Sequence, residues 1–152
     1  MPNEKLNFDE IRELIPHREP FLFLDELINI KKLSKATGVK TYSNNERFFK
    51  GHFPGQPVVP GVILVEMMAQ TAAALIAYSI REETFEKIVY LMNIESTKFR
   101  KPVFPGTKIF TDVNALRSKG RVWRFEGKSY DINDRIICEA KWCAMIMDRR
   151  NE

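Results

Sequence analysis

A run of mostly apolar residues from Val62 to Ile80 constrains the fold more than any other feature of this chain. Its sequence, VILVEMMAQTAAALIAYSI, places apolar side chains on nearly every side of a helix. Such a helix is either buried in a protein core or spans a membrane. Glu66 and Gln70 lie within the run, and the remaining sequence has the character of a soluble protein, with 29% charged residues in the whole chain. We therefore expect a core helix wrapped by other parts of the chain, and no membrane span.

The C-terminal half of the chain supplies the wrapping. Alternation of apolar and polar residues predicts four strands after it, over Ile88–Phe99, Lys108–Arg117, Arg121–Tyr130 and Ile136–Met147. Before it we expect a short helix over Phe8–Ile15, capped by Asn7 with Glu10, and strands over Phe21–Ile30 and Ala36–Tyr42.

Two turn signals, Lys119-Gly120 and Asn133-Asp134, predict that the strands beside them pair as antiparallel hairpins. The length of 152 residues fits one domain, and no linker or repeat divides it. We predict a single α+β domain over residues 1–152, with one antiparallel sheet curled around the hydrophobic helix.

Composition narrows the class of protein further. The two cysteines, Cys138 and Cys143, should face opposite sides of a strand, and we expect both to be small buried residues in a reducing, cytoplasmic compartment. Residues 1–5 do not resemble a signal or transit peptide. Two histidines and two scattered cysteines argue against a zinc site, so we expect no metal. The net charge of +4 suggests an acidic partner, and no nucleic-acid-binding motif accompanies it.

His52 and Glu66 are the candidate acid–base pair. His52 stands in a loop stiffened by prolines and flanked by Gly51 and Gly55, which allow close approach of a ligand. Glu66 lies one turn from Gln70 in the helix that should be buried. A lone histidine is usually a surface or core residue, and a lone glutamate usually reaches a salt bridge. Their combination favours general acid–base chemistry.

Gly61 marks the point where the loop becomes the helix. The first amides of a helix have no backbone partner and carry the positive end of its dipole, so they can polarise a substrate carbonyl. A plain packing role for Gly61 remains the alternative. A base, an acid and an electrophilic amide together suit removal of a proton next to a carbonyl with loss of a group at the next carbon.

Three segments resemble the (3R)-hydroxyacyl-[acyl-carrier-protein] dehydratases of the FabZ type. They are GHFPGQPVVPGVILVEMMAQTAA (Gly51–Ala73), LIPHREPFLFLDEL (Leu14–Leu27) and KFRKPVFPGTKI (Lys98–Ile109). They occur in the family's order, and the resemblance covers nearly the whole chain. It implies a hotdog fold, a long helix wrapped by an antiparallel sheet, which agrees with the fold predicted from the residues.

The resemblance also implies roles for individual residues. His52 matches the family's catalytic histidine, which takes the C2 proton, and Glu66 matches its catalytic acid, which helps the 3-hydroxyl to leave. The backbone amides of Gly61 and Val62 would hold the thioester carbonyl, and Gln70 would orient Glu66. Glu66 also favours dehydration without isomerisation, because the related FabA-type enzymes carry aspartate there. The reaction, a hydro-lyase step of fatty acid elongation and lipid A biosynthesis, needs no metal or redox cofactor.

The family's substrate is carried on the phosphopantetheine of acyl carrier protein, and its site is shared between two chains. The implied assembly is a homodimer in which one chain supplies His52 and its partner Glu66, with a trimer of dimers as the larger form. Phe53, Tyr90 and Phe99 could line an acyl tunnel, with core packing as the alternative. Arg100 and Lys101 could attract the acidic carrier protein, with simple solvation as the alternative.

Two other functions stay open. A hotdog acyl-thioesterase would hydrolyse the thioester with a carboxylate, and a non-catalytic acyl-binding hotdog protein would not need His52 or Glu66. The ordered loop histidine and helix glutamate favour the dehydratase. His17, in the second matching segment, is expected to be a structural residue of a turn or interface.

Overall fold

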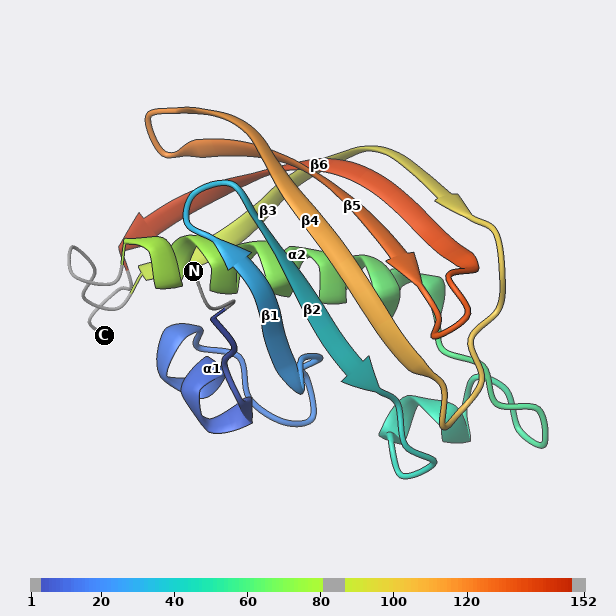
Figure 1. The fold of residues 1–152 in the computed structure, drawn as a ribbon. Helices are drawn as coiled ribbons and strands as arrows, with labels where there is room; N and C mark the ends of the chain where they lie inside the picture. The colour runs from blue at the N-terminus through green and yellow to red at the C-terminus, as the bar shows by residue number, and fades with distance from the viewer. Residues whose placement is uncertain (1–3, 81–86, 149–152) are drawn as a thin grey trace.

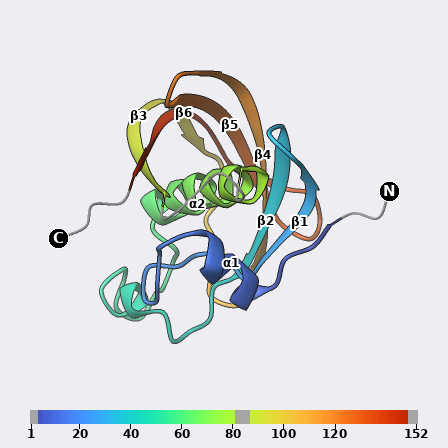
Figure 2. The same cartoon turned by 90° about the vertical axis from the view of Figure 1, so that its left-hand side faces the viewer.

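The long helix α2, Gly61–Ser79, lies along the concave side of one curled antiparallel sheet (Figures 1 and 2). The computed structural model describes residues 4–80 and 87–148. In chain order the other elements are α1 (Phe8–Leu14), β1 (Glu26–Lys31), β2 (Lys35–Thr41), the 3-10 helix η1 (Arg47–Lys50), β3 (Lys87–Phe99), β4 (Lys108–Lys119), β5 (Val122–Tyr130) and β6 (Ile136–Asp148). This is the helix-in-sheet arrangement that the hotdog fold requires.

The six strands are ordered β1-β2-β4-β5-β6-β3, and all pairs are antiparallel. The two predicted hairpins are confirmed: β4 turns into β5 at Lys119 and Gly120, where Gly120 has φ of +61°. The turn between β5 and β6 includes Asp134, which also has a positive φ. β3 pairs with β6 rather than with β4, its successor in the chain, and so forms one edge of the sheet.

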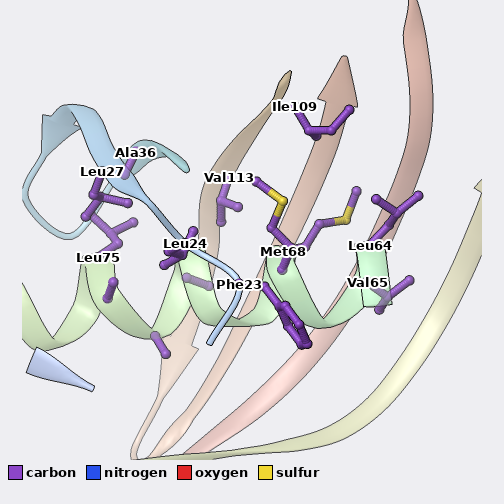
Figure 3. Close-up of a cluster of buried hydrophobic side chains, with 14 of the residues drawn as sticks. Phe23, Leu24, Leu27, Ala36, Leu64, Val65, Met68, Leu75, Ile109 and Val113 are labelled. Carbon is purple, nitrogen blue, oxygen red and sulfur yellow. The ribbon is translucent and has the colours of Figure 1, made fainter. Parts of the chain in front are cut away.

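The core lies between α2 and the inner face of the sheet. Leu75, Met67 and Met68 of α2 are inaccessible to solvent, as are Ile109 and Val113 of β4. Figure 3 shows Leu75 near Leu27 and Met68 near the strands that carry Ile109 and Val113. By length and composition α2 could cross a membrane, but most of it is buried inside this fold. Its apolar surface is therefore used in packing against the sheet.

α1 begins where the sequence predicts. Asn7 accepts a hydrogen bond from the Glu10 amide at 2.9 Å, and the Glu10 carboxylate accepts one from the Asn7 amide at 3.1 Å. This capping box satisfies two amides that the first turn leaves without backbone partners. The helix ends at Leu14, two residues before Pro16.

Two expectations were wrong in part. The strand predicted over Phe21–Ile30 begins only at Glu26, because the backbone at Phe21 and Phe23 bonds to the side chain of Gln70 instead of to a neighbouring strand. Cys138 and Cys143 do face opposite sides of β6, but only Cys138 is buried. The thiol of Cys143 lies on the outer face, 3.6 Å from a carboxylate oxygen of Glu95.

Candidate active site

His52 is fixed at both its backbone and its ring by one residue of its own loop. The amide of Val58 donates to the His52 carbonyl at 3.0 Å, and the ring Nδ1 lies 2.8 Å from the Val58 carbonyl. A carbonyl can only accept, so Nδ1 carries the hydrogen of the neutral ring. Nε2 is left with its lone pair, which is the state required of a general base.

The loop itself is tied to the rest of the molecule. Its Val59 amide donates to the Val103 carbonyl at 2.8 Å, in the segment between β3 and β4. The Phe53 ring stacks on the His52 imidazole with a centroid separation of 4.0 Å, and about half of Phe53 stays exposed. In Figure 1 the loop projects from the end of the molecule at which α2 begins. The imidazole is thus held beside an open surface.

The N-terminus of α2 at Gly61 has no side-chain cap. Since the helix has 19 residues, its first amides carry the full effect of the aligned backbone dipoles. The ring of Phe99 lies so close that a Cβ on Gly61 would come within 2.8 Å of its Cε1. A side chain at this position would therefore displace the half-exposed Phe99 ring, and the amides of Gly61 and Val62 remain at a surface where Val62 is largely exposed.

Glu66 and Gln70 interact as their spacing on α2 predicts. Gln70 is fully buried, and its Nε2 donates to Glu66 Oε1 at 3.2 Å. The same amide group donates to the Phe21 carbonyl at 2.9 Å, and its Oε1 accepts from the Phe23 amide at 2.8 Å. Burial raises the pKa of the Glu66 carboxyl above its usual range, and the Gln70 hydrogen bond offsets part of that rise. Glu66 is thus favoured as a proton donor over an ordinary surface glutamate.

His17, which the sequence predicts to be a structural residue, lies beside Glu66. Its Nε2 lies 3.7 Å from Glu66 Oε1, and its side chain is mostly buried. Burial, with a smaller effect of the neighbouring Arg18, lowers the pKa of its imidazole. The only sequence signal was its place in a segment that resembles the dehydratases, since no spacing rule links positions 17 and 66.

The three predicted tunnel aromatics are each about half exposed. Phe53 contacts His52, and Phe99 covers Gly61, so both lie at the candidate site. Tyr90 lies on the edge strand β3, and among the described residues its ring has no stacking contact with either of the others. None of the three side chains is therefore packed in the core of this chain.

The predicted docking pair forms ion pairs within the chain. Arg100 Nε donates to Glu139 Oε2 at 2.7 Å, and Lys101 Nζ lies 3.6 Å from Asp131 Oδ2. The Arg100 hydrogen bond holds the pKa of Glu139 below its usual range. These contacts offset part of the positive charge that the sequence suggested for this surface.

The candidate base His52, the candidate acid Glu66 and the uncapped start of α2 lie in one chain, and among the described residues no hydrogen bond or ion pair joins His52 to Glu66. The polar partner of the His52 ring is Val58, whereas those of Glu66 are Gln70 and His17. Over residues 4–80 and 87–148 no three His, Cys, Asp or Glu side chains gather as a metal site would require.

Comparisons with known proteins identify the family. The FabA-like domain model matches residues 15–141. A 3-hydroxyacyl-[acyl-carrier-protein] dehydratase FabZ of Rhodospirillum rubrum is 46% identical over 138 residues, which cover 91% of this chain and 86% of that protein. The FabZ of Paramagnetospirillum magneticum is 41% identical over 145 residues, or 95% of this chain and 89% of the relative.

A solved structure shares the fold at low sequence identity. It is the dehydratase heterocomplex ApeI:P of Xenorhabdus doucetiae, with a TM-score of 0.79, 17% identity and 91% of each chain covered. The fold, the family model and the identities to curated relatives agree, and the chain belongs to the FabA-like family, among its FabZ-type 3-hydroxyacyl-[acyl-carrier-protein] dehydratases.

Proposed function

We propose that the chain is a hydro-lyase that converts (3R)-hydroxyacyl thioesters of acyl carrier protein to trans-2-enoyl thioesters in fatty acid biosynthesis. The observation that carries the proposal is Glu66, a half-buried carboxyl with a raised pKa, one turn into a helix whose uncapped end can bind a carbonyl. His52, with its Nε2 lone pair free, supplies the base. The names of the FabZ relatives support the substrate class.

The proposed reaction balances between these groups. Nε2 of His52 takes the C2 proton, and the electrons of that C–H bond form the C2–C3 double bond. The C3–O bond breaks as the Glu66 carboxyl gives its proton to the departing hydroxyl, which leaves as water. Amides at the start of α2 would hold the thioester oxygen while negative charge builds on it. The next turnover requires return of the proton from His52 to Glu66, for which water is sufficient.

We further propose that the working unit is a homodimer with shared sites. β3 is an edge strand that pairs with β6 on one side and with no strand of the described chain on the other, and its Tyr90, Leu91, Met92 and Ile94 are each about half exposed. An edge of this length with exposed apolar residues favours pairing with another strand, and a second copy of the chain supplies one by symmetry. The family resemblance extends the proposal to a trimer of dimers.

We also propose that the protein acts in the cytoplasm and that the same reaction serves lipid A biosynthesis. Acyl carrier protein is the proposed partner, with Arg100 and Lys101 at its docking surface. Because both side chains already contact carboxylates, we expect each to contribute less to docking than a free cation would.

Subunit mixing tests the function and the shared site together. His52→Ala and Glu66→Gln should each abolish formation of the enoyl thioester from a hydroxyacyl carrier protein. When the two variants are unfolded together and refolded in equal amounts, random pairing gives about a quarter of wild-type activity, because half the dimers contain one intact site. The ultraviolet absorbance of the enoyl thioester reports the product.

Three outcomes would contradict the proposal. Full activity of either single variant would remove its residue from the chemistry. Release of free acyl chain, seen by mass spectrometry of the carrier protein, would indicate a thioesterase. Absence of recovery in dimers shown by native mass spectrometry to be mixed would exclude the shared site.

A further inference from the structure

The imidazole of His17 lies near one carboxyl oxygen of Glu66, the proposed acid. His17 lies in the segment between α1 and β1, which packs against α2 on the side away from the sheet (Figure 2). Residues of α1, of this segment and of α2 surround an apolar pocket, among them Leu14, Pro16 and Ala73. His17 is the polar member of that lining, so its ring is kept from bulk water on this side.

Two nitrogen atoms converge on Glu66 Oε1. Gln70 Nε2 donates to it at 3.2 Å, and His17 Nε2 lies 3.7 Å away, slightly beyond hydrogen-bond distance. Catalytic hydrogen bonds of this kind are often long without substrate and shorten in the complex. No described residue donates a hydrogen bond to Oε2 of Glu66. The two oxygens of this carboxyl therefore differ in their surroundings.

The position of the hydrogen on His17 follows from its other nitrogen. Nδ1 is buried and has no hydrogen-bond partner within the described part of the chain. A hydrogen there would be a buried donor without an acceptor, which costs more than a lone pair left without a donor. Burial lowers the pKa of His17 and so favours the neutral ring, whose one hydrogen then belongs on Nε2, the nitrogen that faces Glu66.

The charged groups around Glu66 are few. From the α1–β1 segment the ionisable group that faces it is His17, and from α2 the neighbour is the uncharged Gln70. Arg18 is turned away, because its guanidinium donates to the carbonyls of Arg12, Ile15 and His17. In the proposed dimer the partner chain adds its histidine at position 52.

We propose that His17 is a positioning residue for Glu66: its neutral Nε2–H and the Gln70 amide together hold Oε1, which leaves Oε2 as the oxygen that gives its proton to the departing hydroxyl. The proposal rests on the dehydratase function proposed above. In the protonated acid Oε1 is a carbonyl that accepts both donors. In the ionised product the same two donors stabilise the negative charge, so they assist the transfer as it proceeds.

The test compares two replacements of His17. His17→Phe keeps a planar ring without a donor, whereas His17→Gln keeps an amide N–H near the position of Nε2. We expect kcat of His17→Phe to fall on the order of 10-fold with little change in KM, since the hydrogen bond that is lost is stronger to the developing carboxylate of the transition state than to the neutral acid. His17→Gln should recover most of that loss.

A second measurement reads Glu66 directly. In protein labelled with carboxyl ¹³C-glutamate, the Glu66 signal is assigned by its absence in Glu66→Gln. Loss of a donor to the ionised form should move the Glu66 pKa upward in His17→Phe and leave it near the wild-type value in His17→Gln. Equal activity loss in both variants with an unmoved Glu66 titration would mean that His17 only packs, and would overturn the proposal.

A third measurement needs no variant of His17. The chain has two histidines, so a long-range ¹H–¹⁵N spectrum of the wild-type protein contains two imidazoles, assigned with His52→Ala. We expect the neutral Nε2–H form of His17 at neutral pH, and a charged ring or an Nδ1–H form would overturn the proposal. Failure of the dehydratase function itself would appear separately, as absence of enoyl thioester formation by the wild-type protein.

Discussion

Replacement of Gln70 by leucine should destabilise the fold through two backbone groups rather than through lost packing. The side chains have similar volumes, so the cavity left behind is small. What disappears is the acceptor of the Phe23 amide at 2.8 Å and the donor to the Phe21 carbonyl at 2.9 Å. Phe23 is 1% exposed and Gln70 is 0% exposed, so water cannot easily replace either bond there.

The magnitude follows from those two groups. A buried donor or acceptor left unpaired costs about 1–3 kcal/mol, and the Phe21 carbonyl belongs at the lower end because that residue is half exposed. The sum is about 2–4 kcal/mol of unfolding free energy, which at this chain length corresponds to a fall of about 5–15 °C in Tm. Urea denaturation at fixed protein concentration measures it, since dimerisation would otherwise shift the midpoint.

The control is Glu66→Gln, which removes a proposed catalytic group from the same helix face but leaves the backbone clamp intact. We expect its stability at neutral pH to equal or slightly exceed that of the wild type, while Gln70→Leu is clearly less stable. A Gln70→Leu protein within about 0.5 kcal/mol of the wild type would refute the claim that Gln70 holds the segment at Phe21–Phe23.

Two further predictions concern Glu66 and Gly61. Burial raises the pKa of Glu66 in the folded state, so its contribution to stability is present below the unfolded-state pKa and is lost as pH rises through the folded-state pKa. Glu66→Gln should therefore gain stability relative to the wild type as pH rises from acidic to neutral. A constant difference in unfolding free energy across that range, measured by urea titration, would contradict this prediction. Gly61→Ala should lower kcat/KM on the order of 10-fold without loss of Tm, because its Cβ would meet Phe99 at 2.8 Å while alanine favours the helix. Gly51→Ala is the matched control, since a Cβ there meets no atom within 4 Å, and equal activity of the two variants would remove the contact with Phe99 from the explanation.

The elements that the sequence predicts correctly are those set by local patterns. α2 follows from its apolar run, and α1 follows from the Asn7 and Glu10 pair and the nearby Pro16. The hairpin of β4 and β5 follows from its glycine turn. In each case the residues that determine the element are close to one another in the sequence, so the local sequence is sufficient to predict it.

Features that join distant segments could not be predicted in the same way. Nothing in the alternation of β3 indicates that its partner is β6 rather than the strand that follows it. The segment at Phe21–Phe23 has the composition of a strand, but its backbone bonds to Gln70, 49 and 47 positions away. His17 and Glu66 likewise meet only because α1 and its following loop pack against α2. Tertiary contacts decide all three, and no local propensity records them.

The two polar residues of α2 show how one buried helix face can serve both stability and chemistry. Gln70 uses its amide on three partners and has little capacity left for a substrate. Glu66, one turn earlier, has one oxygen engaged and the other without a donor from the described chain. Oε2 is not an enclosed atom without a partner, so it is accessible from outside the chain and open to a group that the chain itself does not supply. A substrate hydroxyl is the partner that the proposed reaction supplies, and the fixed amide of Gln70 keeps the carboxyl aimed at it.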